Sequence, residues 1–321
     1  YTWHLDDTPG GKDDEINPDV LGYIFEKYIN QKAFGAYYTR TEITEYLCEQ
    51  TIYRLVLQHI NRPAIPGVAA ARHFESVPEL LVGLDAELCR QLLLEILPRL
   101  SLLDPACGSG AFLVAAMKTL INLYSAVIGR IEFLGDKALN DWLKKTRAEH
   151  PSLAYFIKRR IITDNLFGVD IMEEAAEIAR LRLFLALVAS ARTVEQLEPL
   201  PNIDFNILPG NSLIGLLRVD EKEFDRRNPP NMFQKSYHQL VEEKRRQLEI
   251  YRHTTQFSED LQFLRDEIEK GRQQAYTSLN DLLLNEFSRL GIKYEQAAWD
   301  EKKQAEGKPV KRAVQLPDVE A

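Results

Sequence analysis

The sequence predicts an α/β fold with a partial parallel sheet, and two observations support this prediction. Three short apolar runs, at residues 100–104, 165–171 and 205–208, each end in turn residues, as buried strands do. Amphipathic or apolar helical patterns separate them, over residues 111–124 and 173–190. This strand–helix–strand–helix–strand order favours parallel strands joined by right-handed crossovers.

Composition divides the 321 residues into three expected parts. Residues 1–35 form a helical N-terminal lead, and residues 36–220 form the core, with helical insertions at about 61–97 and 129–160. Residues 221–321 are a highly charged helical hairpin that is an insertion in, or an extension of, the core. The helices expected outside the sheet region span residues 17–29, 42–60, 79–97, 237–251 and 257–287.

The helix expected over residues 42–60 shows apolar residues at helical spacing. Thr41 could be the N-cap residue of this helix. We expect this helix to bury one continuous stripe. The residues of the stripe are Ile43, Tyr46, Leu47, Ile52, Leu55 and Val56.

Composition and charge limit the classes of protein that this chain can be. With 45% hydrophobic and 27% charged residues, it matches a globular protein with a real core. No apolar run reaches the ~18 residues of a membrane span, and no signal peptide opens the sequence. The three cysteines are scattered, which indicates neither a disulfide framework nor a metal site, so we expect a cytoplasmic protein. A net charge of −8 argues against strong nucleic-acid binding by this segment alone.

The turn after the first expected strand reads "DPACGSGAFL" over residues 104–113. Gly108 and Gly110 allow a tight bend and close approach of a ligand to backbone amides, and the start of the following helix favours a negative group. The turn therefore predicts a nucleotide-like or carboxylate-bearing cofactor. A dinucleotide fits poorly, because Leu113 stands where the fingerprint needs its third glycine and Asp170 comes far later than ~20 residues on.

This segment resembles motif I of the amino-group DNA methyltransferases, which use S-adenosyl-L-methionine. "FGAYYTRTEI" at 34–43 resembles their motif X, "LFGVDI" at 166–171 motif II, and "NIDFNILPGNSL" at 202–213 motif III. The order X-I-II-III is similar to that of type II and fused restriction–modification methylases that modify N6 of adenine in DNA. The resemblance implies a Rossmann-like class I methyltransferase core.

The resemblance also implies roles for residues in the four motifs. Tyr38 and Thr39 would bind the methionine carboxylate, Asp170 would accept bonds from both ribose hydroxyls, and Asn211 would accept one from the adenine amine. Asp104 would anchor the turn or the methionine ammonium. The expected cofactor-binding residues are Tyr38, Thr39, Asp104, Ala106, Gly108, Gly110, Phe112, Asp170, Ile171 and Asn211.

Each role has a structural alternative that stays open. Asp104 could only begin a turn, and Asp170 could cap the next helix. Tyr38 could fill the core, Thr39 could cap a helix, and Asn211 could occupy a turn. We expect Cys107 to be a small buried side chain that fills space and not a nucleophile.

The family's catalytic motif, Asn/Asp-Pro-Pro-aromatic, is not found in these residues. The one Asn-Pro-Pro, at 228–230, is followed by Asn231 and has no buried strand before it, so we expect a structural loop. The segment therefore predicts the cofactor-binding portion of a larger DNA adenine methyltransferase, inactive alone, with DNA bound mostly by other segments. Methylation of RNA, protein or cytosine N4, or a non-catalytic interaction module, remain alternatives. Cytosine C5 methylation is disfavoured because no cysteine follows a proline.

Overall fold

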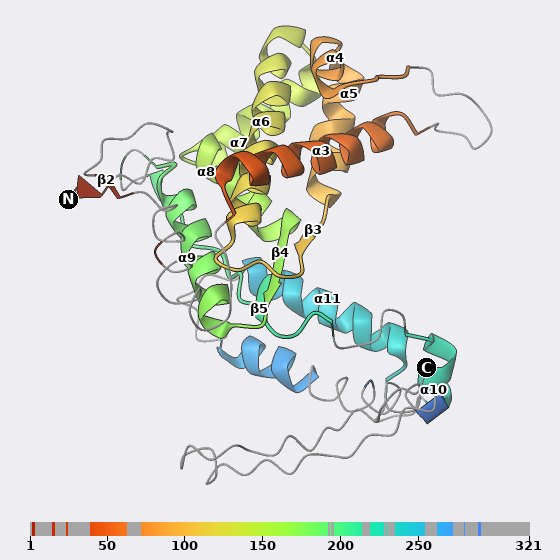
Figure 1. Ribbon diagram of the computed structural model, residues 1–321. Coiled ribbons are helices and arrows are strands. Elements are labelled where there is room, and N and C mark those ends of the chain that lie inside the picture. The colour runs from red at the N-terminus through yellow and green to blue at the C-terminus, as the bar shows by residue number, and fades with distance from the viewer. Residues whose placement is uncertain are drawn as a thin grey trace, which may run out of the picture. The chain divides into compact units, whose positions relative to one another are not determined.

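The computed structural model gives two compact units (Figure 1). The first comprises Tyr1–Leu213 and Tyr251–Leu261, and the second comprises Ile214–Ile250 and Gln262–Ala321. The helix expected at 17–29, most of that expected at 257–287, Tyr38 and the Asn-Pro-Pro sequence lie outside the described residues, apart from single positions. The residues that the structure describes are 2–3, 15–16, 24, 39–62, 72–191, 193, 196–213, 219–227, 229, 235–253, 262–271, 279 and 288–289.

A three-stranded parallel sheet lies at the centre of the first unit. It consists of β3 (Leu102–Asp104), β4 (Leu166–Asp170) and β5 (Ile207–Pro209), in the order β3-β4-β5. Asp104 pairs with Gly168, and Asp170 with Pro209. The three predicted strands and their parallel pairing are confirmed, with starts shifted by one or two residues. Because the strands are parallel, their carboxyl ends meet at one edge of the sheet.

Helices α6 and α9 pack against this sheet, so the arrangement is α/β rather than all-helical. These two helices connect the strands along the chain, as the alternating pattern predicts. The remaining two-residue strands β1 (Thr2–Trp3) and β2 (Glu15–Ile16) pair with each other in parallel. The helices are α3 (Thr41–Ile60), α4 (Val77–Val82), α5 (Ala86–Arg90), α6 (Ala111–Leu134), α7 (Lys137–Glu149), α8 (Leu153–Arg160), α9 (Glu173–Val188), α10 (Glu221–Arg227) and α11 (Tyr237–His253), with π segments η2 (Gln91–Ile96) and η4 (Ile161–Asn165) and the 3-10 turn η3 (Leu97–Arg99).

Two helical expectations are wrong in their limits. The single helix expected over 79–97 is broken after α4, where Gly83 ends one helix and Asp85 caps the next by accepting from the Leu88 amide. The helix expected to end at Tyr124 continues for ten more residues, to Gly135, whose φ of 66° is the left-handed conformation that ends helices.

The expected apolar stripe of α3 is wrong in its first half. The residues that α3 buries are Thr44, Cys48, Ile52 and Val56, each four positions after the last. Ile43, Tyr46 and Leu47 are exposed instead. Arg40 is the N-cap residue, and it makes no side-chain cap, so Thr41 is not the cap that we expected but the first helical residue. The burial of Thr44 and Cys48 follows from the packing of α3 along α6.

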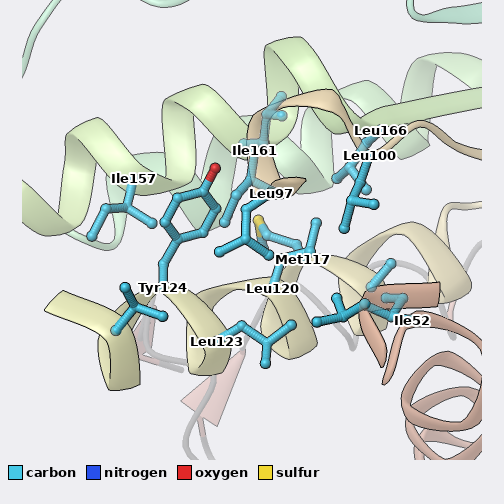
Figure 2. Close-up of a cluster of buried hydrophobic side chains, with 14 of the residues drawn as sticks. Ile52, Leu97, Leu100, Met117, Leu120, Leu123, Tyr124, Ile157, Ile161 and Leu166 are labelled. Atoms are coloured by element: carbon cyan, nitrogen blue, oxygen red, sulfur yellow. The ribbon is translucent and has the colours of Figure 1, made fainter. Parts of the chain in front are cut away.

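The core of the first unit is built around α6. Figure 2 shows Met117, Leu120 and Tyr124 of α6 facing Leu97 and Ile161. By length and composition α6 could cross a membrane, although Lys118, Arg130 and Glu132 interrupt its apolar run. Because 61% of its most apolar stretch is buried inside the protein, we interpret α6 as a core helix.

Two buried asparagines fix the beginnings of β4 and β5. The Nδ2 group of Asn206 donates to the carbonyls of Ile162, Thr163 and Leu166, at 3.2, 2.9 and 3.0 Å. The Nδ2 group of Asn165 likewise donates to two carbonyls just before β3, at 2.8 and 2.7 Å. These carbonyls lie in or directly after η3 and η4, where helical hydrogen bonding ends, and the asparagine amides satisfy them.

Candidate functional site

The turn between β3 and α6 is held against β4 by its backbone. The Cys107 amide donates to the Val169 carbonyl at 2.9 Å, and the Gly110 amide donates to the Cys107 carbonyl at 2.8 Å. Gly108 and Gly110 have φ values of 52° and 86°, in the left-handed region that favours glycine. The two glycines singled out in the sequence are therefore required by the bend itself.

Close packing makes glycine necessary at two positions around this turn. A Cβ added to Gly110 would lie 3.0 Å from the Ala179 Cβ on α9, and one added to Gly168 on β4 would lie 3.0 Å from both the Cys107 Sγ and the Leu113 Cδ1. Leu113 stands at the position of the third glycine of a dinucleotide fingerprint. Its side chain packs against β4 at Gly168, where the absence of a side chain leaves room for it. Sequence reasoning missed Gly168, although a glycine inside an apolar strand is a signal of close approach.

Asp170, at the end of β4, reaches across to the turn. Its Oδ2 accepts from the Gly108 amide at 2.8 Å, and its Oδ1 accepts from the Met172 amide at 3.0 Å. The second bond is a local turn contact two residues along the chain. Met172 is the N-cap residue of α9 and no side chain caps that end of the helix, so the capping alternative for Asp170 is not borne out. Each carboxylate oxygen has a second lone pair, so both remain able to accept a further bond from a ligand hydroxyl.

Asp104, at the end of β3, carries an oxygen without a partner. Its Oδ1 accepts from the Ala106 amide at 3.1 Å, whereas its Oδ2 is buried and meets no hydrogen-bond partner among the described residues. Burial raises the pKa of the Asp104 carboxyl, the Ala106 amide opposes this shift, and the negative charge of Asp170 adds to it. A buried carboxylate oxygen left unpaired is costly, so this atom marks a place where a cationic donor would bind.

Asn211 follows β5 at the same edge of the sheet. The Gly210 amide donates to the Asp170 carbonyl at 2.7 Å, which keeps the ends of β4 and β5 together. Asn211 is exposed, and its Oδ1 accepts from the Leu213 amide at 2.9 Å, the geometry of an Asx turn. Its predicted role toward an adenine amine stays a prediction.

The remaining expected residues differ in exposure. Ile171 is 72% exposed next to Asp170, whereas Phe112 is half-buried against the core. Ala106 is exposed on the turn. The role of Ile171 and Phe112 toward an adenine ring stays a prediction.

Thr39 lies near the first turns of α6, and Tyr38 lies outside the described residues. A small polar cleft runs between the start of α3 and α6, and Lys118 lies 3.9 Å from Glu45 within it. The cleft brings the beginning of motif X next to the helix that follows the glycine turn. Its lining residues are Thr39, Thr41, Thr44, Glu45, Ala111, Val114, Ala115, Lys118 and Arg182.

Neither thiol near the turn is suited to be a nucleophile. Burial raises the pKa of Cys107 to about 12 and that of Cys48 to about 11, and the charge of Asp104 adds to both shifts. A thiol acts as a nucleophile only as the thiolate, which is scarce at neutral pH here. Within the described ranges no group of three His, Cys, Asp or Glu residues is arranged to hold a metal ion.

Comparisons with known proteins agree with the sequence motifs. The family described as the MmeI DNA-methyltransferase domain matches residues 85–212. A protein of Methanocaldococcus jannaschii named as a type II restriction enzyme and methyltransferase is 35% identical over 238 residues, which are 70% of this chain and 18% of that protein. The type II restriction enzyme and methyltransferase RM.Eco57I of Escherichia coli is 26% identical over 210 residues, 62% of this chain and 18% of that protein. The chain thus spans less than a fifth of the length of these curated relatives.

Proposed function

Because this chain is related to type II restriction–methylation enzymes through its methyltransferase domain, we propose that it binds S-adenosyl-L-methionine for the methylation of adenine N6 in DNA. The proposal includes a Rossmann-like class I core and a place within a larger restriction–modification or phage-defence protein of the cytoplasm. Sequence-specific contacts to DNA would come mostly from other segments of that protein.

The observation that carries the proposal is the unpaired oxygen of Asp104 beside the glycine turn. S-adenosyl-L-methionine brings an ammonium, a sulfonium, a carboxylate and a ribose with two hydroxyls. The buried Oδ2 of Asp104 fits the ammonium, because a charge-assisted bond would offset its desolvation. Asp170, 2.8 Å from the Gly108 amide, lies on the adjacent strand end with lone pairs for the ribose hydroxyls.

The other expected contacts follow the same edge of the sheet. Thr39, together with Tyr38, would bind the methionine carboxylate near the start of α6, where helix amides favour an anion. Phe112 and Ile171 would flank the adenine ring, and Asn211 would accept from its amine. When bound, the cofactor supplies an activated methyl group, and the chain's own residues hold and orient it.

The methyl-accepting step needs groups that these 321 residues do not carry in the family's form. An exocyclic amine is made more nucleophilic by acceptors at a flipped base, with an aromatic ring stacked upon it. No Asn-Pro-Pro-aromatic sequence occurs here. We therefore expect residues 1–321 alone to methylate no DNA and the longer protein to do so.

Binding and methylation of the longer protein test the proposal. We expect it to bind S-adenosyl-L-methionine, and Asp170→Ala to abolish binding. Asp164→Ala is the matched control, because Asp164 lies before β4, at the end opposite Asp170, and pairs with Arg160. Radiolabelled methyl transfer to DNA, with RNA and protein as alternative acceptors, followed by nucleoside analysis, identifies the product. No binding by the wild type, or a product other than N6-methyladenine, would contradict the proposal.

A further inference from the structure

A buried arginine on α9, Arg182, donates hydrogen bonds to the glycine turn. Arg182 is 1% exposed, and its Nη1 donates to the Ser109 carbonyl at 2.9 Å and to the Ser109 Oγ at 3.1 Å. Ser109 is itself fully buried. Arginine is almost never fully buried unless it is paired, so its presence under a turn of this kind calls for a function.

The bond from Arg182 completes a set of contacts that hold residues 107–110 of the turn. Cys107 is tied to Val169 on β4, and Gly108 is tied to Asp170 at the end of β4. The peptide unit that joins Ser109 to Gly110 is held at both ends, since its carbonyl accepts from Arg182 and its amide donates to the Cys107 carbonyl. A peptide bonded at both ends is polarised and cannot rotate freely.

The face of α9 that carries Arg182 also packs against the turn at Ala179. Ala179 precedes Arg182 by three positions, so the two side chains lie on the same side of α9. A Cβ on Gly110 would meet Ala179 at 3.0 Å, which shows how closely α9 approaches the turn. Since α9 begins three residues after Asp170, one rigid helix borders both the carboxylate and the turn.

We propose that Arg182 is the positioning residue that sets the orientation of the turn's peptide groups for the cofactor, an inference that rests on the function proposed above. A planar guanidinium can bond two acceptors of one residue in a fixed geometry, which an ammonium or an apolar chain cannot. Loss of Arg182 would take this donor from the buried Ser109 carbonyl, so a loss of stability is expected as well, and the test has to separate the geometry of the turn from stability.

The test compares two arginines of α9 in the longer protein. Arg182→Met removes the bonds to Ser109 and keeps most of the side-chain volume. Arg180→Met is the matched control, because Arg180 pairs with Asp204 at 3.3 Å and contacts no residue of the turn in any described bond. Arg182→Lys keeps the positive charge but lacks the planar guanidinium that can bond two acceptors. Ser109→Ala keeps the backbone carbonyl and removes only the hydroxyl.

We expect Arg182→Met to raise the dissociation constant of S-adenosyl-L-methionine about 10- to 100-fold, as the loss of a charged hydrogen bond would. Arg182→Lys should fall between it and the wild type, and Ser109→Ala and Arg180→Met should stay within about 3-fold of the wild type. The KM for DNA should not change, because the proposed function assigns the turn to the cofactor and places the DNA contacts mostly in other segments. Equal dissociation constants for Arg182→Met and Arg180→Met, with a lowered melting temperature, would overturn the inference in favour of a purely structural arginine.

Hydrogen exchange of the ligand-free protein separates this inference from the proposed function. Amides of residues 107–110 should exchange faster in Arg182→Met than in Arg180→Met, and equal rates would overturn the positioning role. If the wild type binds no S-adenosyl-L-methionine, the proposed function fails, and the exchange rates still decide whether Arg182 holds the turn.

Discussion

The approach of α9 to Gly110 makes one substitution especially informative. Gly110→Ala places a side chain on a residue with φ of 86°, which costs about 1–2 kcal/mol for an L-residue. The new Cβ would also lie 3.0 Å from the Ala179 Cβ and 3.2 Å from its Cα, and the Cα belongs to a helix backbone that cannot turn aside. Overpacking of this kind costs about 1–3 kcal/mol. We therefore expect a total loss of about 2–5 kcal/mol.

A second glycine isolates the packing part of this loss. Gly135→Ala has the same backbone penalty, with φ of 66°, but its Cβ would meet nothing within 4 Å. It should cost only about 1–2 kcal/mol. Ala179→Gly in the Gly110→Ala background removes the closest contact and should recover stability, less about 1 kcal/mol for a glycine inside a helix.

Thermal and urea unfolding, followed by circular dichroism, measure these differences. About 1 kcal/mol corresponds to roughly 2–4 °C in melting temperature for a unit of this size, so Gly110→Ala and Gly135→Ala should separate clearly. If both variants lose the same stability, or if Ala179→Gly gives no recovery, the close approach of α9 to the turn is not what requires glycine at 110.

Three further outcomes follow from buried polar groups. Tyr124→Phe should stabilise the protein by about 1 kcal/mol in urea unfolding, because the Tyr124 hydroxyl is buried with no partner among the described residues, and a loss would show that a partner exists. Asp104→Asn should raise the melting temperature of the ligand-free protein at pH 7: burial raises the folded-state pKa, so the ionised carboxylate destabilises the fold above that pKa, and the gain should vanish as pH falls below the ordinary carboxyl pKa. A pH-independent gain would refute this linkage. Burial raises the pKa of Cys48 and Cys107, so a thiol reagent at pH 8 should modify both only after unfolding; rapid labelling of the native protein would contradict their burial.

Local patterns were sufficient to predict the sheet and the turn. Each strand is a short apolar run followed at once by proline, glycine or an acid, and these features depend on few neighbours in the sequence. The order of the motifs then indicated that Asp104, Asp170 and Asn211 follow three successive strands. Parallel pairing brings the ends of such strands to one edge, and the structure places all three there.

Features that depend on tertiary packing could not be predicted from local sequence patterns. Arg182 stands in "RLRLFLALV", where an arginine is expected to face solvent, and only the position of the turn gives it acceptors inside the core. On α3, periodicity favoured Ile43 and Leu47, but the neighbouring helix covers the face of Thr44 and Cys48. The break at Gly83, by contrast, follows from local residues, because Gly83 ends α4 and the Asp85 side chain accepts from the Leu88 amide at the start of α5.

The asparagines at the amino ends of β4 and β5 have a consequence for the opposite end of the sheet. A strand displaced by a single residue exchanges the side chains on its two faces, so such a slip would turn Asp170 away from Gly108. The carbonyls that Asn206 and Asn165 bind prevent that displacement. Alignment of the two carboxylates thus depends on amide side chains at the far ends of the strands, and substitutions there can abolish ligand recognition without altering any atom that a ligand touches.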